Sequence, residues 1–230
     1  MGSHANLSID ITPQVLLKAY ACGIFPMAES AEDPTLYWIE PEERGVLPLD
    51  QVRVPKRLAR TIRQEKFEIR VDTSFHGVIA GCAAARAGRR TTWINRRIAE
   101  LYEELFRMGY CHTVETWLDG RLVGGLYGVH LGGVFFGESM FSTERDASKV
   151  ALVYLVARLV YGGFKLLDTQ FVTEHLRQFG AIEISRPEFH KRLSEALQVH
   201  CGFHELPLDA AASEVLQLVS QTSKTGCSTA

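Results

Sequence analysis

Apolar and polar positions alternate most clearly between residues 111 and 142, where three apolar runs are separated by two short breaks. The breaks, Asp119-Gly120 and Gly132-Gly133, are dipeptides that suit tight hairpin turns. The pattern predicts an antiparallel meander of three strands over residues 111–118, 121–131 and 133–142. Three glycines in the middle strand indicate either a bulge or room for a ligand; they are Gly124, Gly125 and Gly128.

The third strand carries a glutamate in an apolar setting. Counting in twos predicts that one of its faces holds Phe136, Glu138, Met140 and Ser142. Burying a lone carboxylate costs free energy unless it is paired. Glu138 therefore needs either a basic partner in the fold or a cationic ligand.

A strand, a buried helix and another strand follow this meander. The helix, "ASKVALVYLVARLVYGG", is apolar nearly all round, and "FKLLDTQFV" after it has the composition of a buried strand. This order predicts a right-handed crossover that joins two parallel strands. Asp168 and Gln170 share one face of the second strand. Two acids and one amide on neighbouring strands favour a functional cleft over isolated structural pairs.

The leading part of the chain is shorter and less regular. "TPQVLLKAYACG" predicts a helix with Thr12 as its cap, and four prolines in the following stretch predict short strands and loops. Another helix is expected over residues 55–66, then a strand in "FEIRV", a helix opened by Asp72 and a helix in "NRRIAELYEELFRMG". We expect a small α/β domain over residues 1–54 and a larger domain over residues 55–230, with helix 55–66 near the seam.

Composition describes an ordinary globular chain. Of the 230 residues, 46% are hydrophobic and 23% charged, and no apolar run is long enough to span a bilayer. No secretory signal is expected, and the first four residues could be the remnant of an expression tag. The five cysteines lie far apart without metal-binding spacing, which suggests a reducing cytoplasm.

Basic residues gather in two places although the net charge is −2. One helical face of residues 55–66 carries Arg57, Arg60 and Arg63, and a second cluster places Arg89 and Arg90 beside Trp93. Cations that hold phosphates, together with an aromatic ring that stacks on bases, are typical of single-stranded nucleic-acid binding. A solvated basic face beside a core tryptophan is an equally good interpretation.

The predicted layout, a meander followed by a crossover helix and a parallel strand pair, is that of GNAT-like acyltransferases, which transfer an acyl group to an amine. Enzymes of that type hold coenzyme A with a glycine-rich loop at the start of the crossover helix. The corresponding stretch here, "STERDASKVAL", contains no glycine. We therefore expect the acyl donor to be carried by something else, and no cofactor.

Eight segments between Tyr20 and Gln170 resemble the leucyl/phenylalanyl-tRNA–protein transferases: "YACGIFPM", "GCA", "TWI", "VETW", "LVGGLYGV", "FFGESMFS", "ASKVAL" and "LLDTQ". The resemblance implies an α+β fold with a GNAT-like domain and a mixed, mostly antiparallel sheet. It also implies a cytoplasmic enzyme that moves Leu or Phe from aminoacyl-tRNA to proteins with N-terminal Arg or Lys, which marks them for degradation (the N-end rule). Neither a metal nor a cofactor is implied.

The resemblance also suggests which residues act. Asp168 and Gln170 would act on the attacking amine, with the Gln170 carbonyl orienting its N–H, and Glu138 would receive the basic side chain of the acceptor. Substrate-binding candidates are Met140, Ser142, Leu126, Leu155, Leu159 and Gly137. Candidates for tRNA binding are Trp93, Trp38, Arg57, Arg60, Arg63, Arg89 and Arg90.

Two positions depart from the family pattern. Trp38-Ile39-Glu40-Pro41 stands where relatives often have Trp-Trp-Ser-Pro, and Thr173 stands where they often have Asn. Leucine at several pocket positions leaves the ranking of Leu, Phe and Met donors open. Two other functions stay open from the residues themselves: an acyl-CoA-dependent N-acetyltransferase with an atypical cofactor site, and a non-catalytic RNA-binding module. The histidines fit no ligand set.

Overall fold

The structure is a computed structural model that describes residues 11–33, 35–84 and 92–225. At its centre is a seven-stranded sheet in the order β4-β5-β6-β7-β8-β3-β9. Its only parallel pair in the described residues is β7 with β8, so the predicted mixed, mostly antiparallel sheet of an α+β fold is confirmed. The strands are β3 (Glu43–Val46), β4 (Glu68–Val71), β5 (Cys111–Leu118), β6 (Arg121–Leu131), β7 (Val134–Ser142), β8 (Leu166–Gln170) and β9 (Ile182–Ser185).

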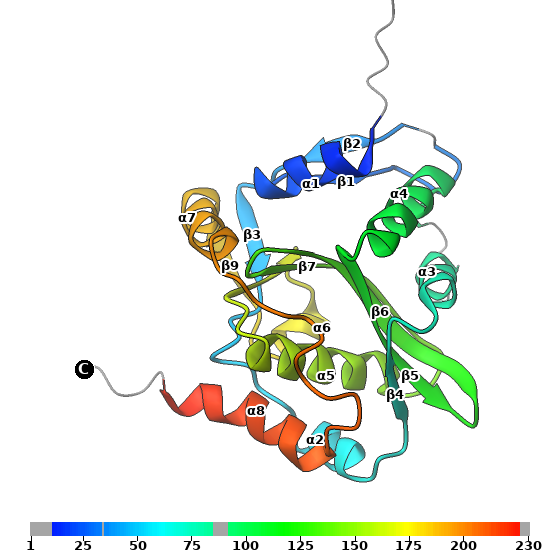
Figure 1. The fold of residues 1–230 in the computed structure, drawn as a ribbon, viewed down its shortest axis with the longest axis vertical. Helices are drawn as coiled ribbons and strands as arrows, with labels where there is room; N and C mark the ends of the chain where they lie inside the picture. Colours follow the sequence, from blue (N-terminus) through cyan, green and yellow to red (C-terminus); the bar gives the residue numbers. More distant parts are fainter. Residues whose placement is uncertain (1–10, 34, 85–91, 226–230) are drawn as a thin grey trace, which may run out of the picture.

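Helices cover both faces of the sheet (Figure 1). On one side, which we call the α5 face, α5 (Ala147–Tyr161) packs on the strands, and α2 (Lys56–Arg63) and α8 (Ala212–Thr225) pack against α5. The opposite side, the α1 face, is covered by α1 (Pro13–Ala21), α3 (Phe75–Ala83), α4 (Arg96–Arg107) and α7 (Arg186–Leu197). Within the described residues, no helix is long and apolar enough to cross a membrane.

Two small elements complete the fold. A separate two-stranded sheet pairs β1 (Phe25–Met27) with β2 (Tyr37–Ile39), and the short helix α6 (Glu174–Arg177) follows β8. Leu176 of α6 is buried in the core of the α5 face, whereas Phe25 of β1 is buried in that of the α1 face. The end of β8 therefore lies between elements of both faces.

The meander and the crossover were predicted correctly. Strands β5, β6 and β7 match the predicted ranges to within one residue at each end, and α5 leads to β8 as a parallel crossover. Asp119 and Gly120 both have positive φ, 51° and 71°, as the two central residues of a type I′ hairpin turn require. Local turn chemistry and periodicity determined these elements.

One prediction about a helix start was wrong. Asp72 does not cap α3: Ser74 holds that position, and Asp72 instead accepts a hydrogen bond from the Thr113 backbone N at 2.6 Å. The leading residues also contribute to the main sheet. Residues 43–46 form β3, which lies between β8 and β9 in the central sheet.

A β-bulge interrupts β7 at Glu138. Gly128 pairs with Gly137 and Tyr127 pairs with Ser139, so Glu138 has no partner on β6. A Cβ on Gly128 would lie 2.3 Å from the carbonyl oxygen of Phe136, which explains the glycine opposite the bulge.

The extra residue inverts the phase of the strand. Phe136 and Glu138 lie on the α1 face, whereas Met140 packs on the α5 face and Ser142 accepts a hydrogen bond from the Ser148 N of α5. The prediction that these four residues share one face was therefore wrong, because counting in twos does not include a bulge.

Candidate active site

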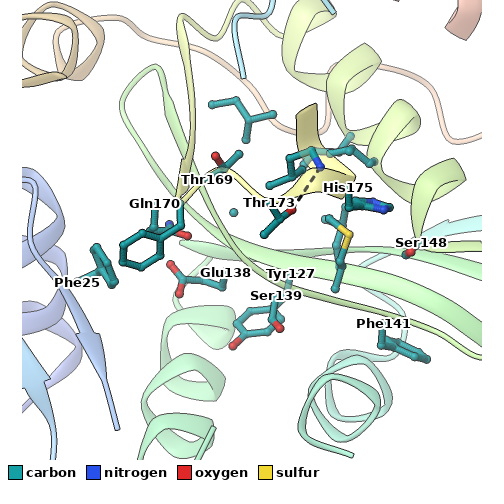
Figure 2. A pocket seen from close by; sticks show the side chains of 18 of the residues that line it. Phe25, Tyr127, Glu138, Ser139, Phe141, Ser148, Thr169, Gln170, Thr173 and His175 are labelled. Carbon is teal, nitrogen blue, oxygen red and sulfur yellow. Dashed lines mark hydrogen bonds between the residues drawn. The ribbon is translucent and has the colours of Figure 1, made fainter. Parts of the chain in front are cut away.

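A pocket of about 430 Å³ lies where β7 and β8 stop pairing. The last paired residues are Phe136 and Asp168, and the lining residues beyond them come from both strands, as Figure 2 shows. The α1 face contributes Phe25, Tyr127, Glu138 and Gln170 to the lining. From the α5 face the lining includes Leu126, Met140, Leu152, Leu155, Leu167 and Leu176. The pocket therefore has a polar end on one side of the sheet and an apolar end on the other.

At the polar end, a buried ion pair joins Asp168 to Arg44 of β3. The guanidinium donates from Nε to Asp168 Oδ1 at 2.8 Å and from Nη2 to Oδ2 at 2.7 Å. It lies between the rings of Phe25 and Phe189, 4.7 and 4.4 Å from their centroids, and also donates to the Gly23 carbonyl. A bidentate pair in which all three guanidinium nitrogens donate a hydrogen bond is a rigid support.

Asp168 in turn fixes Gln170. The Gln170 backbone N donates to Asp168 Oδ1 at 3.0 Å, and its side-chain Nε2 donates to Oδ2 at 3.2 Å. Because only the NH₂ end of an amide can donate to a carboxylate, Oε1 of Gln170 is the end left for the pocket. Gln170 also has φ 56°, a left-handed conformation that is uncommon outside glycine. With the two bonds from Arg44, Asp168 accepts four hydrogen bonds in total, so it acts as a support rather than as a base.

Glu138 belongs to a closed ring of three hydroxyl-bearing groups. Tyr20 Oη lies 2.5 Å from Glu138 Oε1, Tyr102 Oη lies 2.9 Å from Oε2, and the two tyrosine oxygens lie 2.5 Å apart. Three hydrogen bonds need three protons, and the two tyrosines supply two. The carboxyl group of Glu138 supplies the third proton in its neutral form, whereas the ionised form accepts a hydrogen bond from each tyrosine.

Burial gives the same result for Glu138. It raises the pKa of this carboxyl from 4.5 to about 7, and the hydrogen bonds from Tyr20 and Tyr102 offset only part of the increase. Burial also raises the pKa of both tyrosines well above the ordinary value, so they stay protonated. Near neutral pH, Glu138 is poised between its neutral and ionised forms.

Most substrate-binding candidates line the pocket. Leu159 does not: it is fully buried in the core of the α5 face. Asp168 lies behind Gln170 and is fully buried as well. The predicted residues that do line the pocket are Trp93, Leu126, Gly137, Glu138, Met140, Ser142, Leu155 and Gln170.

The three glycines of β6 are not among the lining residues. Gly128 faces the bulge, and a Cβ on Gly124 would lie 2.6 Å from the Cβ of Ala147 in α5. Of the two interpretations, bulge or ligand room, the bulge is seen at Gly128, and Gly124 allows close packing of α5.

The tRNA-binding candidates lie on the surface. Arg57, Arg60 and Arg63 are exposed on α2, and Trp38 on β2 is 40% exposed. Arg89 and Arg90 lie outside the described residues. A second hollow next to the pocket is lined by Arg57, Arg145 and Lys149 together with Glu144 and Asp146, and shares Ser142, Ser148 and His175 with the pocket. Arg57 pairs there with Asp146 at 3.0 Å. Basic side chains thus extend from α2 to the pocket.

Three side chains at the polar end were not predicted from the sequence: Tyr20, Arg44 and Tyr102. Each reaches Glu138 or Asp168 from at least 36 positions away in the chain, so no local spacing indicates it. Leu152 could have been found, because it precedes Leu155 by one helical turn. The other lining residues not predicted include Phe25, Tyr127, Ser139, Thr169, Phe171, Thr173, His175 and Leu176.

Comparisons with known proteins agree along the chain. A model of the leucyl/phenylalanyl-tRNA protein transferase family matches residues 46–194, and a model of that family's N-terminal domain matches residues 9–42. A protein named leucyl/phenylalanyl-tRNA–protein transferase from Nitrobacter winogradskyi is 59% identical over 96% of this chain and 99% of its own length. A protein of the same name from Rhodopseudomonas palustris HaA2 is 58% identical over 96% of this chain and 99% of its own length. Another, from Caulobacter vibrioides, is 59% identical over 90% of this chain and 96% of its own length.

Among solved structures, L-PGS from Bacillus licheniformis matches with a TM-score of 0.35 and 12% identity, over 79% of this chain and 62% of that one. A match at this level carries no argument. The GNAT-like description of the larger domain stays a prediction.

Proposed function

The chain belongs to the leucyl/phenylalanyl-tRNA–protein transferase family and is an aminoacyltransferase, and from this premise we propose how the pocket performs the transfer. The amine nitrogen of the acceptor attacks the carbonyl carbon of the aminoacyl ester. The bond to the ribose oxygen breaks, and a proton from the amine replaces it on that oxygen. This aminolysis runs downhill and needs no cofactor.

The apolar end of the pocket suits the side chain of the donor amino acid. Met140, Leu152 and Leu155 face it from β7 and α5, with Leu126 and Leu176 beside them. A leucyl or phenylalanyl group enclosed there would gain about 2 kcal/mol from burial. The ester carbonyl would then lie towards the polar end.

Gln170 would position the attacking amine. Its Oε1 is the amide atom left for the pocket, and it can accept a hydrogen bond from the amine N–H. An unperturbed α-amine has a pKa of about 7.7 to 8.0, so a useful fraction is already neutral near pH 7 and orientation matters more than a strong base. Arg44 holds Asp168, which in turn holds the amide, and the Asp168 carboxylate would offset the positive charge that develops on the nitrogen.

Glu138 would receive the N-terminal Arg or Lys side chain of the acceptor. A cation next to a carboxyl that is half ionised at pH 7 favours the ionised form, so binding would shift Glu138 further towards the carboxylate. Glu138 would thereby make a basic first residue preferable to a neutral one. Such acceptors are the proteins that this reaction would mark for degradation.

Trp93 and the arginines of α2 would hold the tRNA. Trp93 lines the pocket and can stack on the terminal adenine, while Arg57, Arg60 and Arg63 are exposed for phosphates. Trp38, Arg89 and Arg90 are further candidates. Because aminoacyl-tRNA is the donor, we propose that the enzyme works in the cytoplasm.

The proposed division into two domains, 1–54 and 55–230, needs a different seam. The two family models leave a break between residues 42 and 46, and β3 pairs within the main sheet. Both observations support a seam just before β3. The leading unit would still contribute Tyr20 and Phe25 to the site.

One observation carries the proposal: Asp168 fixes the amide of Gln170 at the polar end of a pocket whose other end is apolar. The test incubates the protein with labelled leucyl-tRNA and a peptide that begins with arginine. We expect label on the peptide, and a loss of about a hundredfold or more in the transfer rate for Gln170→Ala with tRNA affinity unchanged.

The same assay separates the other two functions. Turnover of acetyl-CoA without use of leucyl-tRNA would support an N-acetyltransferase, and tRNA binding without any transfer would support a binding module. Full activity of Gln170→Ala would contradict the role of the amide.

A further inference from the structure

Three side chains with metal-binding atoms meet at one end of the sheet, and none of them lines the pocket. Asp72 follows β4, His112 lies on β5, and His204 lies between α7 and α8. One oxygen of Asp72 and one ring nitrogen of each histidine all lie within 4.8 Å of one another. These residues are 40 and 92 positions apart in the chain, so sequence spacing could not indicate the cluster.

We propose that Asp72, His112 and His204 form a zinc site. Zn²⁺ binds histidine nitrogen and aspartate oxygen at about 2.0–2.2 Å in a tetrahedral arrangement, which separates neighbouring donor atoms by about 3.3 Å. Asp72 Oδ2 lies 2.8 Å from His112 Nδ1 and 3.3 Å from His204 Nε2. Binding therefore needs a small opening of the first pair, and an adjustment of the two histidine nitrogens, which lie within 4.8 Å of each other. The fourth position is left for a water molecule, since the His204 side chain is largely exposed.

Neighbouring groups hold two of the three ligands in place. The Thr113 backbone N donates to Asp72 Oδ1 at 2.6 Å, which leaves Oδ2 to face the histidines. The ring of His112 stacks on Phe203, with centroids 4.1 Å apart and planes 15° apart. Partners that orient ligands in this way are typical of metal sites. His204 is the exposed ligand, so its side chain has room to adjust on binding.

The surroundings of His112 leave Nδ1 as its ligand atom. Nε2 of His112 is buried without a hydrogen-bond partner among the described residues, whereas Nδ1 lies 2.8 Å from Asp72 Oδ2. A metal at Nδ1 would replace the single hydrogen bond to Asp72.

The site would fasten an irregular segment to the sheet. Residues 198–211 connect α7 to α8 without a helix or strand, and carry Phe203 and Leu206 into the core. Arg158 already holds this segment, because its Nη1 donates to the carbonyls of Phe203 and Leu206 at 3.0 and 2.8 Å. A zinc ion at His204 would add a bond from the same segment to β4 and β5.

Cobalt and zinc titrations of the purified full chain test this proposal. Co²⁺ gives visible absorption bands whose intensity reports a four-coordinate site, and calorimetry with Zn²⁺ gives affinity and stoichiometry. We expect one ion per chain, at least about tenfold weaker binding for His204→Ala, and recovery for His204→Cys, which restores a ligand. Zn²⁺ should also raise the melting temperature of the wild type but not of His204→Ala.

His200→Ala is the matched control, because it removes an exposed histidine from the same segment that is not part of the cluster. It should bind metal as the wild type does. The proposal is overturned if the wild type shows no saturable binding, or if His204→Ala binds Zn²⁺ as tightly as the wild type. In either case Asp72 and His112 form only an ion pair, and the proposed transfer reaction is unaffected.

Discussion

Glu138 makes the choice of acceptor depend on pH. Its pKa of about 7 is raised by burial, so the carboxyl is neutral at low pH and becomes ionised as the pH rises through 7. Only the ionised form can pair with a guanidinium. Preference for a peptide with N-terminal arginine over its neutral citrulline analogue should therefore rise with pH.

For a pKa of about 7, the ionised fraction increases about tenfold between pH 6 and pH 8. The ratio of kcat/KM for the two peptides should increase by a similar factor, and using the ratio cancels the titration of the α-amine. Glu138→Gln should give a low ratio that does not change with pH. If the ratio does not change with pH in the wild type either, Glu138 does not recognise the basic side chain of the acceptor.

Arg44 is expected to act through Asp168 on the orientation of Gln170. Arg44→Lys keeps the positive charge but cannot form the two-pronged pair with Asp168, so Gln170 would be held less firmly. We expect kcat to fall about tenfold to a hundredfold with little change in KM.

Arg44→Met should destabilise the fold as well, by about 3–5 kcal/mol, because it leaves the Asp168 carboxylate buried without a cationic partner. Arg70→Lys is the control for the first variant, since Arg70 pairs with Glu68 at the exposed edge of the sheet. Equal kcat values for Arg44→Lys and the wild type would show that the pair has no positioning role.

At the scale of elements, the bulge in β7 is what opens the site. It turns Glu138 to the α1 face and Met140 to the α5 face, so one strand contributes to both ends of the pocket. A second irregularity leaves Thr169 of β8 unpaired with β3, beside Gln170. Bulges next to active sites commonly aim side chains in this way.

Gly128→Ala should therefore destabilise the protein and reduce transfer. The added Cβ would lie 2.3 Å from the Phe136 carbonyl oxygen and 2.4 Å from the ring of Phe135, so the bulge would have to shift. We expect a loss of about 1–3 kcal/mol in the free energy of unfolding, measured with denaturant.

Gly137→Ala is the matched control for stability. Its added Cβ would meet no atom closer than 3.4 Å, and the expected change is under about 1 kcal/mol. Equal unfolding free energies for the two variants would mean that the bulge is not what requires Gly128.

The elements themselves could be predicted from the sequence because their signals are local. Asp119-Gly120 and Gly132-Gly133 gave the limits of three strands, and the apolar helix between two strands gave the parallel crossover. The bulge at Glu138 could not be predicted, since it depends on how β6 and β7 align. Asp168 and Gln170 were recognised as a pair, but their support from Arg44 depends on β3 crossing into the sheet.

At the scale of the whole molecule, we expect the placement of the charges, rather than the net charge, to decide the binding of tRNA. The arginines of α2 lie on the surface next to the hollow that adjoins the pocket. Replacing Arg57, Arg60 and Arg63 together by alanine should raise KM for aminoacyl-tRNA. It should also make binding less sensitive to salt. The slope of the logarithm of the tRNA binding constant against the logarithm of salt concentration should become smaller in magnitude by about 2 to 3.

A triple variant with the same change in net charge is the control. Arg70, Arg107 and Arg192 each pair with an acidic side chain within four residues of their own position, on other elements. Their removal should leave the slope nearly unchanged. If both triple variants reduce the slope equally, tRNA binding depends on the net charge of the protein and not on contacts with α2.

The central claim is that ester and amine meet where β7 and β8 separate. A crystal structure with a stable 3′-amide analogue of phenylalanyl-adenosine tests it most directly. We predict the phenyl ring between Met140, Leu152 and Leu155, with the analogue's carbonyl near Oε1 of Gln170. An analogue bound with its side chain outside this pocket would contradict the account.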